Sequence, residues 1–344
     1  GYYQTLFGYN SLKWNKKIEP IRYREAQKNY METLELVAVK ATDRFFALAA
    51  AQSNYETASF NYANADTLYQ YAQGRYSIGT ITENEILQLE LNKLTEETNR
   101  MNAGIEVENA MQSLRSYLGI QEDVELQVVI DEDVPNFIVP LNEALMMAGT
   151  NSPEIQNMIR RKLESESAVA QAKSSAGLKA DVYIRFGLTQ TADKFRDAYR
   201  NPLEQQLISL GFALPILDWG RGKGKVRVAK SQRDLVHTQV EQNRTDFDLN
   251  VRKLVKQFNL QAQRVQIAGK TNETAKRRHD VARRLYILGK STILDLNASI
   301  AEKDAAKRNY VTALYNYWSL YYTLRSITLY DFERNCELSK DLSI

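Results

Sequence analysis

Residues that interrupt long helices or build covalent sites are scarce in this sequence. Its 344 residues include only 6 prolines and 15 glycines, which leaves room for long uninterrupted helices. The single cysteine, Cys336, excludes an internal disulfide. The two histidines, His237 and His279, have no cysteine or carboxylate cluster at metal-ligand spacing. We therefore expect no metal site and interpret both histidines as solvated helical residues.

An excess of charge of one sign is missing too. The 45 basic and 42 acidic residues leave a net charge of +3, which argues against a dedicated nucleic-acid-binding protein. No apolar run approaches the roughly 20 residues of a membrane-spanning helix. A Ser/His/Asp set, a paired-carboxylate cleft and a cofactor fingerprint are also absent, so we predict that the protein is not an enzyme and uses no cofactor.

The run "GRGKGK" (220–225) resembles a phosphate-binding loop only superficially. It lacks the G-x-x-x-x-G-K-[ST] spacing, and Val226 follows its last lysine, so we reject that function. We interpret its basic residues as a solvated helix start that is able to lie near anionic headgroups, although cations are mildly unfavourable at a helix N-terminus. These residues are Arg221, Lys223, Lys225, Arg227 and Lys230.

Four long stretches keep the three-, four- and seven-residue apolar spacing that is typical of amphipathic helices. They cover about residues 14–76, 82–118, 222–288 and 291–327. The first and third would each be roughly 90–100 Å long at 1.5 Å per residue, which favours a coiled-coil or tubular architecture over a compact domain.

Three segments break this helical period and are predicted strands: residues 3–14, 181–191 and 204–216. The polar stretch 192–202 would be the loop between the last two strands. A further helix is predicted over 153–176, because Ser152 provides a cap and Pro153 follows it.

An internal repeat relates the two halves of the chain. An offset of 210 aligns Gly79 with Gly289, Tyr76 with Tyr286, Lys93 with Lys303, and "LRS" at 114–116 with "LRS" at 324–326. An offset of 205 aligns Trp14 with Trp219, so we expect the two long helices to differ in length by about five residues.

The repeat predicts the organisation of the chain. Each full repeat would run helix, strand, loop, strand, very long helix, tight turn and shorter helix. The first repeat begins in its second strand, so we expect an N-terminal piece of roughly 60 or more residues to precede it. The predicted divisions are an incomplete repeat 1 (1–120), a connector (121–140), repeat 2 (141–327) and a C-terminal tail (328–344). The connector and the tail would both lie near the middle of the long helices.

These motifs together resemble the TolC family of outer-membrane efflux channels. The similar segments are "LPILDWGRG" before a long helix, and the two turns "RLYILGKSTILDL" and "RYSIGTITENEILQLE". The resemblance implies a mainly α protein with a minor β part, in which very long antiparallel helical hairpins form an α-barrel segment in the periplasm. It also implies that short strands belong to an outer-membrane β-barrel, that the full-length protein is a homotrimer, and that it contacts outer-membrane lipid.

The resemblance assigns the two glycine turns to the periplasmic tip, where a periplasmic adaptor protein would bind. The implied adaptor-contact residues are Arg75, Ser77, Ile78, Gly79, Thr80, Leu288, Gly289, Lys290 and Ser291. The alternative is that both glycines are ordinary helix C-caps.

The resemblance also implies an entrance gate near these turns. Its candidate residues are Tyr286, Asp295, Glu85 and Asn84. Ser291 replaces the family's arginine and Ala298 replaces its second aspartate, so we expect a latch between Tyr286 and Glu85 or Asn84 rather than one centred on arginine. A ring of Asp295 carboxylates would select cations, although Asp295 equally suits the first turn of a helix.

At the strand-to-helix junctions we single out five residues: a proline and a turn that would end the strand, and two tryptophans with a membrane-interface role or a packing role. They are Trp14, Pro215, Asp218, Trp219 and Gly220.

The predicted function is a passive outer-membrane exit channel of a tripartite efflux or type I secretion system. Drugs or other small molecules would leave through it, by way of the adaptor and an inner-membrane pump. The alternative is a soluble coiled-coil scaffold without a membrane role. A di-iron helical bundle is disfavoured because it needs Glu-x-x-His motifs, and none is present.

Overall fold

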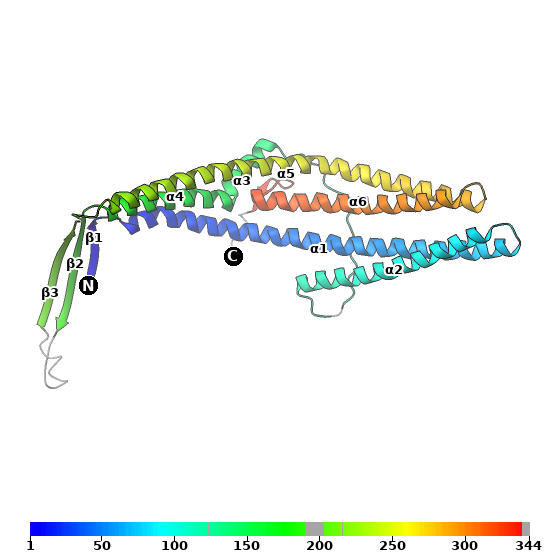
Figure 1. Cartoon of the computed structure of the whole chain (residues 1–344), viewed down its shortest axis with the longest axis horizontal. Coiled ribbons are helices and arrows are strands. Elements are labelled where there is room, and N and C mark those ends of the chain that lie inside the picture. Colours follow the sequence, from blue (N-terminus) through cyan, green and yellow to red (C-terminus); the bar gives the residue numbers. More distant parts are fainter. Residues whose placement is uncertain (123, 190–202, 215, 339–344) are drawn as a thin grey trace, which may run out of the picture. The chain divides into compact units, whose positions relative to one another are not determined.

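The protein is mainly helical, with a minor β part (Figure 1). The computed structural model describes residues 1–122, 124–189, 203–214 and 216–338. None of the helices in this described part is both long and apolar enough to cross a membrane. In chain order the elements are β1 (Tyr2–Phe7), α1 (Ser11–Ser77), α2 (Glu83–Leu118), α3 (Leu141–Asn151), α4 (Pro153–Ser175), β2 (Lys179–Thr189), β3 (Leu203–Ala213), α5 (Arg221–Ile287), α6 (Ile293–Thr328), β4 (Tyr330–Asp331) and β5 (Cys336–Glu337).

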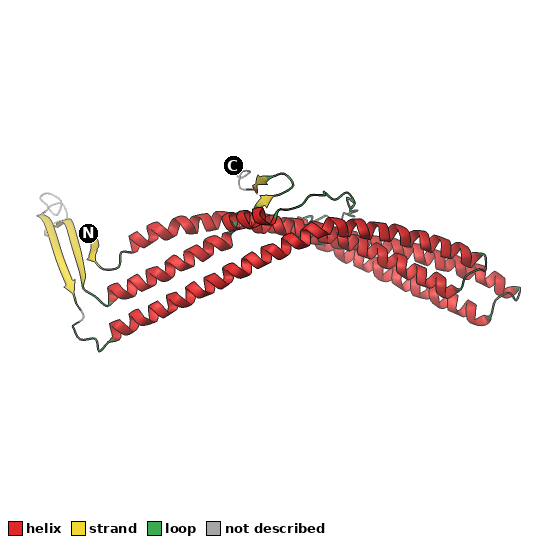
Figure 2. Ribbon diagram, turned by 90° about the horizontal axis from the view of Figure 1, so that it is seen from above, coloured by secondary structure: helices red, strands yellow, loops and turns green. Residues whose placement is uncertain are grey.

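The long helices, drawn in red in Figure 2, form two pairs of equal length. α1 and α5 each contain 67 residues, and α2 and α6 each contain 36. Every boundary of α5 and α6 lies 210 residues after its counterpart in α1 and α2. The prediction of two repeats built on very long helical hairpins is therefore confirmed. The expected five-residue difference between the two long helices is wrong.

The two tryptophans that suggested this difference lie in different structural positions. The strand predicted over 3–14 ends at Phe7, and α1 begins soon after it. The Asn10 side chain accepts a backbone hydrogen bond of 2.9 Å in this first turn, which favours helix over a longer strand. Trp14 consequently lies inside α1, whereas Trp219 precedes α5 in a left-handed conformation with a φ of 48°.

β1, β2 and β3 form one antiparallel sheet in that order. β2 and β3 pair with each other along all 11 residues of each strand. The strands predicted over 181–191 and 204–216 are therefore confirmed, with shifts of one to three residues at their ends. The predicted loop 192–202 and Pro215 lie outside the described residues.

Three short elements were missed by the sequence analysis, namely α3, β4 and β5. α3 has 11 residues, and β4 and β5 have two residues each. Two residues are too few for a period to be recognised, and the 11 residues of α3 fill only the shortest window in which a helical period is read. The pairing of β4 with β5 also depends on a chain reversal just after α6, which periodicity does not encode.

The chain forms two compact units. The first contains residues 1–30 and 149–250, and the second contains residues 31–148 and 251–344. α1 and α5 each contribute residues to both units. The first unit therefore holds the three-stranded sheet, α4 and the beginnings of α1 and α5.

A buried ion pair joins α1 to α4 in the first unit. Arg160 contacts both carboxylate oxygens of Glu25, at 2.6 and 3.1 Å, and Asn157 donates a third hydrogen bond at 2.9 Å. The hydrogen bond from Arg160 is the main reason that the pKa of Glu25 lies below its usual value. Because the pKa of Glu25 is lower in the folded protein than in the unfolded chain, the ion pair stabilises the unit at pH values above the ordinary carboxyl pKa. This stabilisation is lost as the pH falls through the folded pKa of Glu25.

An aromatic cluster forms part of the core of the second unit. Phe258 of α5 is 1% exposed, and its ring lies 5.2 Å from that of Phe137 and 5.4 Å from that of Tyr317. Tyr317 of α6 donates a hydrogen bond to the Pro135 carbonyl. The cluster therefore packs α5, α6 and the connector together.

The connector predicted over 121–140 contains no helix or strand in its described residues. Two side-chain amides replace the missing secondary-structure hydrogen bonds. Gln52 of α1 donates to the Leu126 carbonyl at 2.7 Å and accepts from the Val128 amide at 3.2 Å. Asn259 of α5 exchanges two such bonds, of 2.9 and 3.0 Å, with the backbone of Val139. The connector is thus fixed against both long helices.

Replacing Phe258 by alanine should lower the free energy of unfolding by about 3–5 kcal/mol, because the cavity left in the aromatic cluster has no side chain to fill it. Leu260→Ala is the matched control on the same helix, since Leu260 is 43% exposed, and it should cost about 0.5 kcal/mol. Urea unfolding followed by circular dichroism measures both. Equal losses would show that Phe258 does not anchor the core.

Candidate functional site at the helical tips

The α1–α2 and α5–α6 connections have the same backbone geometry. Gly79 and Gly289 adopt left-handed conformations with φ values of 75° and 70°. Each glycine amide donates to a carbonyl three residues earlier, that of Tyr76 at 2.9 Å and that of Tyr286 at 3.0 Å. The next amide donates to the carbonyl five residues earlier, at 3.0 and 2.9 Å respectively. Other residues would be strained by about 1–2 kcal/mol in this conformation, which explains the glycines.

Matching capping boxes start the helices that follow the two turns. The Thr82 hydroxyl accepts from the Glu85 amide at 3.3 Å, and the Glu85 carboxylate accepts from the Thr82 amide at 2.9 Å. Thr292 and Asp295 make the equivalent pair of bonds, at 3.2 and 3.3 Å. Each box satisfies amides that the helix itself leaves unpaired, so both turns have a fixed exit direction.

A small apolar core holds the two turns together in the second unit. Leu68 and Ala72 of α1, Leu89 of α2 and Leu296 of α6 are buried in this core. Tyr286 of α5 packs against it. All four long helices therefore contribute to one cluster close to the turns.

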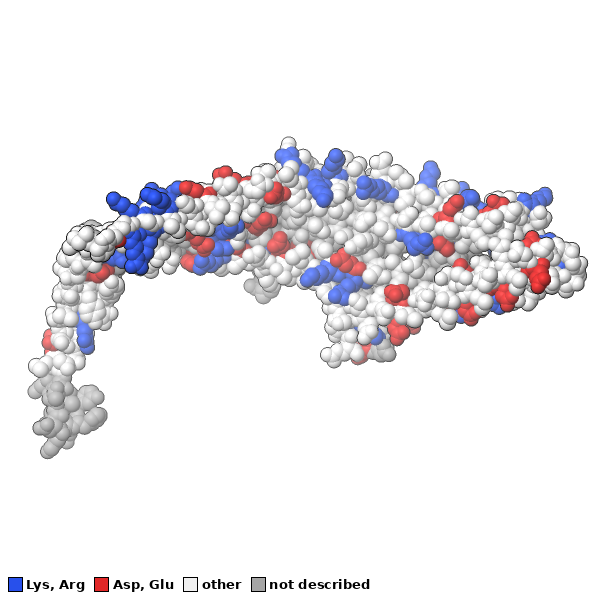
Figure 3. All heavy atoms as spheres, viewed as in Figure 1, with Lys and Arg blue, Asp and Glu red and all other residues white. Residues whose placement is uncertain are grey.

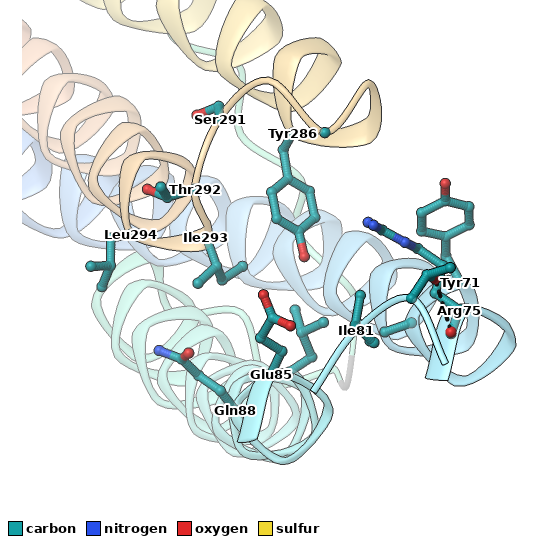
Figure 4. A pocket seen from close by; sticks show the side chains of 14 residues that line it. Tyr71, Arg75, Ile81, Glu85, Gln88, Tyr286, Ser291, Thr292, Ile293 and Leu294 are labelled. Carbon is teal, nitrogen blue, oxygen red and sulfur yellow. Dashed lines mark hydrogen bonds between the residues drawn. The ribbon is translucent and has the colours of Figure 1, made fainter. Parts of the chain in front are cut away.

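A cavity of about 400 Å³ lies between the two turns (Figure 4). Arg75 of α1, Glu85 of α2 and Tyr286 of α5 point into it from three different helices. No hydrogen bond joins these three side chains to one another within the described residues. They are held near each other by the packing of the helices and by their charges.

Arg75 is the electrostatic centre of this cavity. Burial raises the pKa of the Tyr286 hydroxyl, and the positive charge of Arg75 opposes that rise. Hydrogen bonds from Thr82, first from its backbone, lower the pKa of Glu85, and Arg75 lowers it further. The cavity thus holds a cation, a carboxylate and a neutral hydroxyl at neutral pH.

The structure places two of the four candidate gate residues in the cavity and two outside it. Tyr286 and Glu85 line the cavity, whereas Asn84 is exposed and does not line it. Asp295 is exposed too, and its carboxylate accepts hydrogen bonds from Thr292 and Ser291. Those bonds, led by the one from the Thr292 side chain, lower the pKa of Asp295. The position of Asp295 matches the helix-capping alternative, and its role in cation selection stays a prediction.

Arg75 was expected at the adaptor-contact surface but not in the gate. The latch that we expected excluded an arginine because Ser291 occupies the position of the family's arginine. Arg75, which belongs to the first repeat, supplies a guanidinium to the cavity, whereas Ser291 belongs to the second repeat. Arg75 lies four residues before Gly79 and four residues after Tyr71, and its guanidinium lies 5.9 Å from the centre of the Tyr71 ring. That spacing was the only feature of the sequence that pointed to a role for Arg75 in the cavity.

The predicted adaptor-contact residues lie at or beside the two turns. Ile78 is 72% exposed and Leu288 is 67% exposed, and the two are related by the 210-residue offset. Each turn therefore presents one apolar side chain beside its glycine. Ser77, Thr80 and Lys290 are exposed as well, and Ser291 is half-buried.

The sequence profile described as "outer membrane efflux protein" matches residues 145–328, which is more than half of the chain. The chain belongs to the outer membrane efflux protein family. Membership identifies it at the family level as an outer-membrane efflux channel and confirms the resemblance to the TolC family.

The fold of this efflux protein is similar to those of solved outer-membrane proteins. CmeC of Campylobacter jejuni is 15% identical with a TM-score of 0.71, over 92% of this chain and 67% of that one. The channel OprN is 16% identical with a TM-score of 0.75, over 95% and 73%. VceC of Vibrio cholerae is 14% identical with a TM-score of 0.70, over 92% and 76%. A comparison with curated protein sequences gave no match.

His279 of the efflux protein is buried rather than solvated, which corrects the interpretation from sequence. It is 3% exposed, and its Nδ1 lies 3.2 Å from the Ser299 hydroxyl. Because that hydroxyl donates to the Leu296 carbonyl at 2.7 Å, Nδ1 must carry the proton in this contact. The other ring nitrogen, Nε2, is buried and has no partner among the described residues.

The surroundings of His279 disfavour its charged form. Burial is the main cause of its lowered pKa, and Lys303 on α6 and Arg283 on α5 act in the same direction. Asp280 on α5 and Asp304 on α6 oppose the shift but do not cancel it. The imidazole is therefore neutral in the folded efflux protein at neutral pH.

The candidate junction residues before α5 form a capping turn in the first unit. The Asp218 carboxylate accepts hydrogen bonds from the amides of Gly220 at 3.0 Å and Gly222 at 2.7 Å. These bonds lower its pKa, the one from Gly222 most strongly. Trp219 is 92% exposed, so it contributes nothing to packing within the chain.

Because the folded pKa of His279 is lowered, the unfolded state binds more protons and stability is lost as the pH falls through and below about 6.5. His279→Gln removes the titrating group and should flatten the stability curve between about pH 5 and pH 7. Thermal unfolding across this range measures the effect. An unchanged slope in the variant would show that His279 does not cause the acid sensitivity.

Proposed function

We propose that this efflux protein is the passive exit channel of a tripartite efflux or type I secretion system. Its cargo would be drugs or other small molecules, which move down their gradient through a water-filled duct. The full-length protein would act as a homotrimer in the outer membrane, with its helical part in the periplasm. A periplasmic adaptor and an inner-membrane pump would bring cargo to it and supply the energy.

The repeated construction of the two tips is the observation that carries this proposal. Both turns have the same backbone geometry and the same capping box, and each exposes one apolar residue, Ile78 or Leu288. A partner that recognises one turn is therefore able to recognise the other with the same contacts. An adaptor with repeated copies around a symmetric assembly fits such a surface.

The cavity beneath the tips supports a role in opening. Arg75, Glu85 and Tyr286 come from both repeats, and only charge and packing hold them near one another. Separating the two hairpins would move the Tyr286 hydroxyl away from the Arg75 guanidinium, so the polar groups of the cavity favour the closed state. Binding of the adaptor at the turns would then shift the cavity toward an open state.

The alternative of a soluble scaffold is disfavoured by the sheet. β3 is exposed at every position, and its exposed residues include Leu207, Ile208, Leu210 and Phe212. A soluble scaffold has no reason to keep so many apolar side chains in water.

Replacing Gly79 and Gly289 together by tryptophan should abolish drug export while the protein still folds. The bulky side chains would occupy the tip surface, and the left-handed backbone would be strained by a few kcal/mol in total. Export is measured as antibiotic resistance of cells that lack their own channel and carry this one.

Gly74→Trp is the matched control for side-chain bulk. Gly74 lies in α1 near the same turn, has no positive φ, and has open space where a Cβ would point. This variant should keep full resistance. Resistance that is unchanged in the double tip variant would remove the turns from the mechanism.

Removing the polar side chains of the cavity should favour the open state. A variant combining Arg75→Ala with Tyr286→Phe lacks the guanidinium and the hydroxyl, so we expect its conductance in planar lipid bilayers to rise several-fold. Lys290→Ala is the control, because Lys290 lies at the same tip but does not line the cavity. Equal conductance in all three proteins would contradict the proposed gate.

A further inference from the structure

Exposed basic side chains gather in the first unit where the helices meet the sheet (Figure 3). They lie at the beginning of α1, around the end of α4, and at the beginning of α5. We call this group the basic patch. It consists of Lys13, Lys16, Lys17, Lys173, Lys179, Arg221, Lys223, Lys225, Arg227 and Lys230.

The basic patch has few acidic residues to balance it locally. The stretches 11–17, 170–180 and 219–230 contain no aspartate or glutamate, although the whole chain is almost neutral with a net charge of +3. Asp218 lies beside the patch and offsets one of its ten positive charges, near Lys223, while its carboxylate also accepts hydrogen bonds from the Gly220 and Gly222 amides. Within the described residues, no side chain of the patch forms an ion pair. The positive charge is therefore available to an external anion.

Helix stability does not explain the position of these charges. α1 and α5 have no acidic residue in their first turns, whereas α2, α4 and α6 all do. Acidic residues stabilise the start of a helix and basic residues oppose it, so the beginnings of α1 and α5 carry the less favourable charge. A binding partner for the cations accounts for this arrangement.

The three parts of the patch belong to one packed end of the first unit. Gly222 near the beginning of α5 lies directly against Ala176 at the end of α4. Tyr9, just before α1, hydrogen-bonds to Ser167 of α4 at 2.7 Å. An extended anionic surface is therefore able to contact all three parts at once.

The residues that precede the patch point to the nature of that surface. Along the chain, β3 exposes apolar side chains, and Leu214, Ile216 and Leu217 continue this exposure beyond the strand. Trp219 follows, 92% exposed, and the basic residues of α5 begin two positions later. A membrane protein that passes from the bilayer core through the interface to the headgroups shows the same order: apolar residues first, then an aromatic residue, then cations.

We propose that the basic patch binds the anionic headgroups of the periplasmic leaflet and so fixes the depth of the protein in the outer membrane. The ligand is a phospholipid that carries a net negative charge, such as phosphatidylglycerol. This inference rests on the proposed outer-membrane function and adds a lipid partner to it. Trp219 sits in the interface, and the cations face the phosphate layer.

The test is flotation of the purified full chain with vesicles of two compositions, phosphatidylcholine alone and phosphatidylcholine with phosphatidylglycerol. The variant Lys223→Gln/Lys225→Gln/Lys230→Gln removes three charges of the patch. It should bind the phosphatidylglycerol vesicles about a hundredfold more weakly than the unchanged protein, since each lysine near an anionic surface contributes roughly a fivefold factor. The unchanged protein should also bind less well as salt is added.

The variant Lys253→Gln/Lys256→Gln/Lys270→Gln is the matched control. It removes three exposed lysines of the same helix outside the patch and should bind like the unchanged protein. Equal losses in both variants, or a loss on phosphatidylcholine vesicles as large as that on phosphatidylglycerol vesicles, would overturn the proposal. So would a much larger loss of the difference in inorganic phosphate than in sodium chloride of equal ionic strength, which would indicate a site for the free ion.

The failure of this inference is distinguishable from failure of the proposed function. If the unchanged protein binds both kinds of vesicle equally and restores drug resistance, the lipid preference is wrong and the channel function stands. If it prefers phosphatidylglycerol but does not restore export, the preference stands and the export function is wrong. Absence of binding to either vesicle would overturn both the preference and the membrane location.

Discussion

Lateral packing between helices is the interaction on which this structure depends. A helix of 67 residues has no core of its own and must bury an apolar stripe against its neighbours. α5 shows this stripe in the second unit, where three- and four-residue steps separate Val251, Val255, Phe258, Ala262 and Val265, all of them buried. The repeat satisfies the requirement with two helical hairpins of equal length. Each hairpin supplies the apolar surface that the other lacks.

Polar groups inside this packing define how the helices align. Asn61 of α1 donates to Asp304 of α6 at 2.7 Å and accepts from Lys303 at 3.0 Å. His279 of α5 and Ser299 of α6 form a second buried contact. Sliding one helix by a turn would leave these groups unpaired, at a cost of about 1–3 kcal/mol for each. Apolar stripes tolerate such a shift better, so the polar contacts select one register.

The two repeats agree closely at the tips and differ at the strand-to-helix junctions. Gly79 and Gly289 close turns of the same geometry, which the adaptor proposed above would recognise with repeated contacts. At the junctions, α1 follows an Asn10 cap, whereas α5 follows the Asp218 turn and an exposed Trp219. Packing alone does not require this difference. The lipid contact proposed for the basic patch gives the α5 junction a chemistry of its own.

Residues close together in the chain specify the local structure, and the sequence therefore predicted the four long helices from apolar spacing and the turns between them from glycines. These features depend on residues within a few positions of one another, and physical chemistry specifies them locally. Long-range packing brings Arg75 to Glu85 and Tyr286 and buries His279, and the sequence did not predict either. Those contacts join different helices, and Arg75 and Tyr286 come from different repeats. An apolar period shows which face of a helix is covered, but the helix that covers it is chosen by packing of the whole bundle.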